Sequence, residues 1–255
     1  MKTGNSIRIK SLEEIERLRR AGKILAVIVS ELRRSLKSGM TTLDIDTKAQ
    51  ELMTGFRVRP AFKGYRGFPG CICVSVNEQV VHGIPGKRVV KDGDIVSVDV
   101  GIVLDNYFSD TAFTVGIGQI TSELEILLNV TKEALDRGIE KARAGYHLSD
   151  ISFAIQQFVE MKGFSVVRDF VGHGIGTALH EDPEVPNFGA PHCGPILKEG
   201  MVLAIEPMVN IGLPHTKICD DGWTVVTQDG KPSAHFEHTV VIQKSEAEIL
   251  TEING

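Results

Sequence analysis

The chain has 255 residues, of which 42% are hydrophobic and 24% are charged, an ordinary globular composition with ample material for a core. Its formal net charge of −5 at pH 7 excludes the strongly basic balance that is typical of nucleic-acid-binding domains. The longest apolar run near the N-terminus, residues 24–29, is far shorter than the ~20 residues of a membrane-spanning helix.

The first residues also lack the pattern of a secretory signal peptide. The four cysteines are too few and too irregularly spaced for a disulfide framework or a zinc site. We therefore expect a cytoplasmic protein that binds neither nucleic acid nor a membrane directly.

Two helices are expected in the first part of the chain. Ser11 followed by Glu14 forms a capping box, so a helix should begin at Ser11, and its amphipathic pattern fades before Gly39. A second helix is expected at about residues 43–53, with Gly55 as its stop signal.

Two further helices follow, and strands are expected in the intervals. One helix should start at Ser122, with Glu125 three residues on, and end before Gly145. The next should cover about residues 150–161, with Gly163 as its stop. Strand patterns occur at residues 71–76, 95–103, 107–115, 201–209, 223–227 and 234–242.

Three short segments of the first half return in the second half at a nearly constant offset. They are GMTTLDI at 39–45 with GYHLSDI at 145–151, GFRV at 55–58 with GFSV at 163–166, and KDGDIVSVD at 91–99 with KEGMVLAIE at 198–206. Repetition in register predicts a duplicated unit, with halves at about residues 11–118 and 119–245 packed about a pseudo-twofold axis. The alternative is chance, because short matches of glycine and charged residues arise easily.

The repeat makes a prediction about four acidic residues. Asp99 aligns with Glu206, and the following strand of each half carries another acid among apolar residues, Asp110 or Glu237. A twofold axis would bring all four carboxylates together, where repulsion and burial would neutralise them unless cations were bound. Paired divalent metal ions ~3.5–4 Å apart recur in hydrolases. The alternative for any single acid is a solvated or ion-paired side chain.

The glycine-rich stretch VGHGIGTALHEDP, residues 171–183, holds His173 and His180. His173 is a candidate ligand, and one imidazole among carboxylates favours Mn, Fe, Co or Zn over Mg or Ca. His180 is a candidate proton donor across the cleft. A phosphate-binding loop is the alternative, although the GxGxG spacing lacks the Lys-Ser/Thr that should follow. His82, also followed by Gly-Ile, is a candidate first-half counterpart of His173.

Four other histidines lie outside such glycine-containing motifs. We expect them at the surface or in loops: His147, His192, His215 and His235.

Several motifs resemble those of the methionine aminopeptidases. They are NEQVVHGIP at 77–85, GHGIGTALHEDP at 172–183, AIEPM at 204–208, DGWTVVT at 221–227 and FEHTVV at 236–241. The likeness covers about residues 11–242, and the short interval between His180 and Glu206 resembles the type I enzymes, which lack a helical insertion there.

This resemblance implies an α+β fold of the pita-bread type in a single catalytic domain, residues 1–255. Such a fold has a curved antiparallel sheet, pseudo-twofold symmetry and helices packed on the outer face of the sheet. The resemblance also implies removal of the initiator methionine from nascent proteins when the second residue is small. It implies, as partners, the N-termini of these proteins and a transient association with the ribosome, and we expect a monomer.

The resemblance also assigns the metal ligands. Asp110 and Glu237 would bridge two divalent ions (Co, Mn, Fe or Zn), Asp99 would complete one of them, and His173 with Glu206 the other. A water or hydroxide between the ions would be the nucleophile. Glu206 would accept its proton as general base.

Further residues are implied around these ligands. His180 would bind the scissile carbonyl, and His82 would contact the nitrogen side of the peptide bond. Asn77 and Ser233 match positions whose backbone holds a monovalent cation in relatives. The positions that match the methionine pocket are Phe62, Tyr65, Phe68, Cys73, Leu179 and Trp223.

The expected pocket departs from the commonest family pattern at two positions. Phe62 replaces a small thiol residue, and Leu179 replaces an aromatic one. Both keep the pocket apolar, as a methionine side chain requires.

Two other functions stay open at this point. A proline-specific aminopeptidase of the same fold would use the same five ligands, although such chains usually carry a further N-terminal domain. A non-catalytic protein of this fold would bind a protein or nucleic acid, although such relatives have lost ligands.

Overall fold

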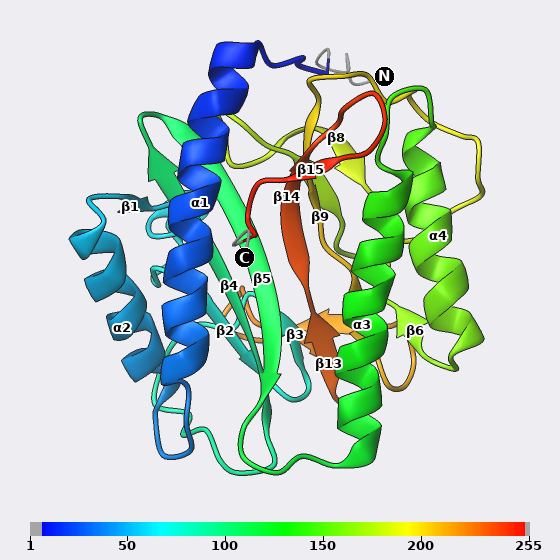
Figure 1. Cartoon of the computed structure of the whole chain (residues 1–255). Coiled ribbons are helices and arrows are strands. Elements are labelled where there is room, and N and C mark those ends of the chain that lie inside the picture. The colour runs from blue at the N-terminus through cyan, green and yellow to red at the C-terminus, as the bar shows by residue number, and fades with distance from the viewer. Residues whose placement is uncertain (1–6, 253–255) are drawn as a thin grey trace.

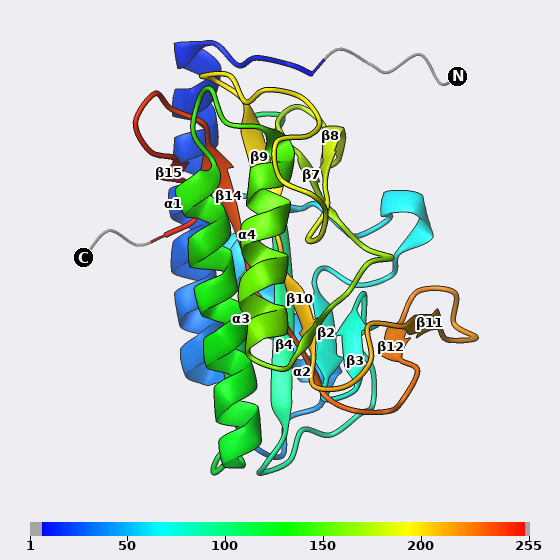
Figure 2. The ribbon, with the colours of Figure 1, turned by 90° about the vertical axis from the view of Figure 1, so that its right-hand side faces the viewer.

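The computed structural model describes residues 7–252, in which α-helices cover one face of an antiparallel sheet (Figures 1 and 2). The helices are α1 (Leu12–Ser35), α2 (Thr42–Gly55), α3 (Ser122–Lys141) and α4 (Leu148–Met161). In Figure 1, α1 lies across β4 and β5, and α3 and α4 lie side by side over the other half. All four expected helices are therefore confirmed. None of the helices within the described range is both long and apolar enough to cross a bilayer.

The starts of the helices follow their capping residues. Ser11 caps α1 as predicted: its hydroxyl accepts from the Glu14 amide at 3.3 Å, and the Glu14 carboxylate accepts from the Ser11 amide at 2.9 Å. Helix α3 begins at Ser122, but its cap is Thr121, whose hydroxyl accepts from the Leu124 amide at 3.4 Å. The residue with the extended backbone, and not the first helical one, supplies the cap.

The strands form one large and two small antiparallel sheets within the described residues. The bounds in the first half are β1 (Arg59–Pro60), β2 (Cys73–Val76), β3 (Gln79–Val81), β4 (Ile95–Leu104) and β5 (Tyr107–Gly116). Those in the second half are β6 (Ser165–Val166), β7 (Gly172–Gly174), β8 (Glu181–Val185), β9 (Val202–Ile205), β10 (Met208–Asn210), β11 (Thr216–Ile218), β12 (Val225–Thr227), β13 (Ser233–His235), β14 (Glu237–Val241) and β15 (Glu248–Ile249).

The large sheet runs in the order β1-β4-β5-β14-β9-β7-β8, with β2 also on β4 and β15 on β14. The small sheets are β13-β10-β6 and β11-β12-β3. A short 3-10 turn, η1 (Tyr65–Gly67), and the β11–β12 hairpin lie on the side of the sheet away from the helices (Figure 2). This second face is where the cavity described below opens.

Two strands expected to be continuous are broken. Residues 201–209 form β9 and β10 with a break at Glu206 and Pro207, and residues 234–242 form β13 and β14 with a break at Phe236. Proline has no amide hydrogen to donate to a ladder, which ends β9 at this point. After each break the chain pairs in a different sheet.

Strands β5 and β14 meet at the middle of the large sheet, where buried threonine hydroxyls supply part of the hydrogen bonding. The Thr239 hydroxyl donates to the carbonyl of Asp110 at 2.7 Å, and the Thr111 hydroxyl donates to the carbonyl of Glu237 at 2.6 Å. The backbones of the two central acidic residues are thereby fixed against each other.

Candidate active site

Three of the predicted carboxylates project from one face of the large sheet. Asp99 on β4 and Glu237 on β14 lie opposite Ala112 of β5, one on each side of it. Asp110 precedes Ala112 by two residues on β5. Because successive side chains of a strand alternate between faces, the three carboxylates share a face.

The remaining two candidate ligands reach the same face from the second half. His173 on β7 lies opposite Ala204 of β9, and Glu206 follows Ala204 by two residues. The glycines beside His173 allow this approach: a Cβ at Gly172 would lie 2.3 Å from the Ala204 carbonyl oxygen, and one at Gly174 would lie 2.3 Å from a backbone oxygen of β8. The part of the glycine-rich stretch that carries His173 is therefore a short, tightly enclosed strand.

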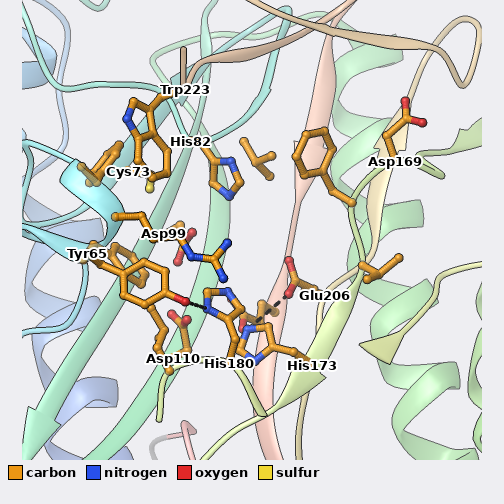
Figure 3. A pocket seen from close by; sticks show the side chains of 18 residues that line it. Tyr65, Cys73, His82, Asp99, Asp110, Asp169, His173, His180, Glu206 and Trp223 are labelled. Atoms are coloured by element: carbon orange, nitrogen blue, oxygen red, sulfur yellow. Dashed lines mark hydrogen bonds and ion pairs between the residues drawn. The ribbon is translucent and has the colours of Figure 1, made fainter. Parts of the chain in front are cut away.

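These side chains converge in a cavity of about 280 Å³ (Figure 3). Candidate ligand atoms of Asp110, His173 and Glu237 lie within 4.8 Å of one another. Asp99 and Glu206 line the same cavity. The structure therefore brings all five predicted ligands to one place.

Burial and mutual repulsion shift the titration of these carboxyl groups. Burial, and then the charge of Glu206, raises the pKa of Asp110 to about 7, and burial raises the pKa of Glu206 to about 8. Burial, followed by neighbouring carboxylates, raises the pKa of Asp99 and of Glu237 well above their ordinary values. Such shifts indicate that the ionised forms of these carboxyl groups are disfavoured here and that the protein does not compensate their charge.

The residues fit divalent metal ions. One oxygen each of Asp99, Asp110 and Glu237 is buried without a hydrogen-bond partner among residues 7–252. The Nδ1 atom of His173 lies 2.9 Å from the Gly174 carbonyl, which can only accept, so the hydrogen is on Nδ1 and the Nε2 lone pair is free. Burial lowers the pKa of His173 to about 3, which keeps the imidazole neutral. Carboxylates with one neutral imidazole suit Mn, Fe, Co or Zn.

His180 lies beside this cluster. Its ring centroid is 4.3 Å from that of His173, and its Nδ1 atom is 2.8 Å from the Tyr65 hydroxyl (Figure 3). Burial, and then the charge of Arg66, lowers the pKa of His180. The predicted proton donor thus lines the cavity together with the ligands.

His82 lines the cavity among aromatic rings. Its backbone has φ +59°, a conformation that is uncommon for a residue other than glycine. Its ring makes edge contacts with Phe170 and Trp223, at centroid distances of 5.5 and 6.2 Å. Burial, and then the neighbouring charges of other histidines, lowers the pKa of His82 to about 4. A strained, neutral imidazole facing a cavity is a candidate functional group.

The residues predicted for the methionine pocket form one apolar cluster at the cavity. Four of them are buried and two are half-buried: Phe62, Phe68, Cys73 and Leu179, then Tyr65 and Trp223. The ring of Phe62 packs against Gly101, where an added Cβ would lie 2.5 Å from the ring. Gly101 of β4 pairs with Asp110 of β5. The apolar wall therefore directly adjoins the carboxylates.

One expectation about the histidines is wrong. His235 is neither at the surface nor in a loop: it ends β13, is 1% exposed, and its Nε2 atom lies 3.5 Å from Oε2 of Glu206. The sequence held a signal for this position. In the expected strand at residues 234–242, His235 lies two residues before Glu237, so alternation places both side chains on the same face. His192 and His215 are exposed as expected, and His147 caps α4.

Asn187 also contacts the site, and no sequence signal indicated it. It is 1% exposed, and its Nδ2 atom donates to the carbonyl of Glu206 at 3.0 Å. Asn187 follows β8 in an irregular segment, where no periodicity predicts the direction of a side chain. Separately, Asn77 and Ser233 lie together, with the Ser233 amide donating to the Asn77 carbonyl at 2.9 Å.

Comparisons with known proteins show the family to which the chain belongs. The profile of metallopeptidase family M24 matches residues 16–244, and the chain belongs to this family. A methionine aminopeptidase of Clostridium perfringens is 55% identical over 96% of this chain and 98% of its own length. The crystal structure of a methionine aminopeptidase from Thermotoga maritima matches with a TM-score of 0.95 and 49% identity, covering 97% of this chain and 100% of the other. The predicted resemblance and pita-bread fold are thereby confirmed.

A more distant likeness extends to a prolidase from Pyrococcus furiosus, with a TM-score of 0.79 and 23% identity. It covers 97% of this chain but 66% of the prolidase. At this identity the likeness shows the fold alone.

Proposed function

We propose that this chain removes the N-terminal methionine from peptides and nascent proteins by metal-dependent hydrolysis. The observation that carries the proposal is the convergence of five metal-ligand side chains with an apolar cluster in one cavity. The family and the high identity to proteins named methionine aminopeptidase support the same conclusion.

The five ligands would hold two divalent ions, for which Co, Mn, Fe and Zn are candidates. Asp110 and Glu237, on the paired strands β5 and β14, would contact both ions. Asp99 would bind one ion, and His173 with Glu206 would bind the other. Bound ions of this kind supply Lewis acidity and lower the pKa of water to about 7. The unpartnered carboxylate oxygens and the free Nε2 of His173 support this assignment.

Glu206 would accept the proton of the attacking water. Its carboxylate lies 3.7 Å from Nε2 of His173 and 3.5 Å from Nε2 of His235, so it is enclosed on two sides by imidazoles. Burial raises the pKa of Glu206, and a bound divalent ion would oppose that shift, so that the carboxylate is available to accept a proton.

The two other histidines would act on the scissile peptide bond. When the Tyr65 hydroxyl donates to Nδ1 of His180, the hydrogen of His180 resides on Nε2, which can donate to the carbonyl oxygen as negative charge develops there. His82 would contact the nitrogen of the leaving amine. The edge contacts with Phe170 and Trp223 hold its ring in place.

The apolar cluster would bind the methionine side chain. Methionine is long, flexible and polarisable, so a wall of aromatic and aliphatic residues suits it without a polar partner. Phe62 and Leu179 fill the positions that depart from the common family pattern, and both are buried in this wall.

The finer assignments remain proposals. They are a preference for a small second residue, a monovalent cation at the backbone of Asn77 and Ser233, a transient association with the ribosome and action in the cytoplasm. The four free cysteines accord with a reducing compartment. A monomer and one catalytic domain of two related halves also stay predictions; the strand order, in which β4-β5 adjoins β14-β9, supports the latter.

The test is release of free amino acid from two peptides. The purified protein is incubated with Met-Ala-Ser and with Ala-Pro, each with Mn or Co and with a chelator. We expect methionine release that requires metal and stops with chelator. Release from Ala-Pro alone would favour a proline-specific aminopeptidase, and no release with either peptide would favour a non-catalytic binding protein.

A further inference from the structure

A buried ion pair joins the segment before α1 to the turn that carries His180. The Nζ atom of Lys10 lies 2.7 Å from Oε2 of Glu181, and the two side chains are only 2% and 13% exposed. Glu181 follows His180 directly in the chain. Charged side chains are seldom buried without a partner, and this pair lies outside the metal-ligand cluster.

Glu181 uses its other oxygen to close the turn. Its Oε1 atom accepts from the amides of Thr177 and Ala178 at 2.8 and 3.2 Å, and from the Thr177 hydroxyl at 3.3 Å. One carboxylate therefore holds both the backbone of the turn and the Lys10 ammonium. Residues 177–181 include His180 and Leu179, a proton donor and a pocket residue of the proposed site.

Lys10 is itself firmly placed. Its backbone amide donates to the Gly200 carbonyl at 2.9 Å, next to the start of β9. Its side chain passes against Gly176, where an added Cβ would lie 2.7 Å from Cε of Lys10. Burial lowers the pKa of Lys10, and the hydrogen bond and charge of Glu181 oppose that shift. The turn is thus anchored to the sheet through a fixed cation.

The buried pair of Lys10 and Glu181 is better explained by a role in positioning the turn than by a role in attaching the N-terminal segment. A buried ion pair is weak evidence for stability, because desolvation of both charges offsets their attraction. Its fixed geometry instead limits the positions that the turn can take. Across the cavity, the Tyr65 hydroxyl holds Nδ1 of His180 at 2.8 Å, a bond that requires the turn to stay in place.

We propose that Lys10 and Glu181 are positioning residues that fix the turn of residues 177–181, so that His180 faces the substrate carbonyl. This inference rests on the proposed function for the role of His180. Misplacement of a catalytic group by about 1 Å can lower a rate about a hundredfold. Because His180 would act on charge that develops in the transition state, loss of the pair should lower kcat more than it raises KM.

The test compares Lys10→Met, which removes the ammonium, and Glu181→Gln, which removes the carboxylate charge, with the rescue variant Lys10→Arg. The matched control is Arg34→Met, which breaks the exposed Arg34–Glu31 pair of α1 at 2.8 Å. Two quantities are measured: kcat and KM for Met-Ala-Ser with Mn, and amide hydrogen exchange of residues 176–181 without metal.

We expect Lys10→Met and Glu181→Gln each to lower kcat about tenfold, with KM changed less than about twofold. The double variant should lose no more than either single variant, because the two residues act as one unit. Exchange at the Thr177 and Ala178 amides should be faster in both single variants. Lys10→Arg should recover most of the loss in kcat, and Arg34→Met should match the wild type.

Each contrary result is distinct. A folded Lys10→Met protein with wild-type kcat and exchange would overturn the inference, and Glu181→Gln decides it in the same way if Lys10→Met does not fold. Faster exchange with unchanged kcat would also overturn it, by reducing the pair to a structural role. Inactivity of the wild type on Met-Ala-Ser would instead refute the proposed function and leave the exchange result interpretable.

Discussion

The two sides of the proposed metal site hold their acidic residues in different ways. Asp99 and Asp110 lie inside β4 and β5, two strands of 10 residues each that pair over their full length. Glu206 lies just past the 4-residue strand β9, and Glu237 is the first residue of β14. The first side is a regular hairpin, whereas the second is built from short strands and breaks.

The difference shows what each side needs to position a carboxylate. In the regular hairpin the ladder fixes the direction of every side chain. At a break, backbone groups leave the ladder and other residues must satisfy them. Asn187 does this for the carbonyl of Glu206, and His235 packs against its carboxylate. The second side therefore depends on side chains from outside its own strands, whereas the backbone of Asp110 is held by the pairing of β4 with β5 and by the Thr239 hydroxyl of β14.

The largest effect on activity should come from Asp110 and Glu237, the two acidic residues at the junction of β5 and β14. Asp110→Asn and Glu237→Gln should each reduce methionine release about a thousandfold or more, since loss of a proposed metal ligand would remove several kcal/mol of metal-dependent stabilisation. Asp105→Asn, at the exposed turn of the same hairpin as Asp110, is the matched control and should retain activity. A large loss of activity in only one of these two variants would show that Asp110 and Glu237 are not equivalent in function.

A smaller effect, on metal affinity, should show how far the position of Glu206 depends on the side chains around the strand break. Asn187→Ala removes the donor to the Glu206 carbonyl and should weaken Mn binding about tenfold, measured by calorimetry. Asn210→Ala is the control, because Asn210 is also buried and donates through Nδ2 to a backbone carbonyl, that of Leu213 at 2.9 Å. Equal Mn affinities in both variants would mean that the break at Glu206 needs no support.

The smallest effect is the pH dependence of stability without metal. The folded-state pKa values of Asp110 and Glu206, about 7 and about 8, lie above the ordinary values of 3.8 and 4.5. The folded protein then binds more protons than the unfolded chain, and its stability falls as pH rises through this window. His173 and His82, with pKa values lowered from 6.5 to about 3 and about 4, act in the opposite direction, an effect that fades above about pH 7 as the unfolded imidazoles become neutral.

Thermal unfolding in chelator should therefore show a lower Tm at pH 8 than at pH 6.5. Saturating Mn should reduce or reverse this difference, because metal binding requires the ionised carboxylates. Asp110→Asn should flatten the dependence in chelator. A Tm that rises from pH 6.5 to pH 8 in chelator would contradict the uncompensated charge inferred for the cavity.

The sequence by itself determined the elements whose signals are local. Ser11 with Glu14 started a helix, alternating and continuous apolar runs marked β4 and β5, and the repeat aligned Asp99 with Glu206. Such patterns depend only on side-chain periodicity and on capping chemistry within a few residues. The resemblance to the family then indicated most of the residues that line the cavity, although not Arg66, Asp169 or Phe170.

Only the tertiary structure decided the features that depend on contacts between distant segments. The break at Pro207 sends the chain into a second sheet, where Met208 of β10 pairs with His235 of β13. Asn187 and Lys10 each find their partner in another segment, Glu206 and Glu181 respectively. Periodicity gives the face of an element but not its neighbours, because neighbours are set by packing of the whole chain.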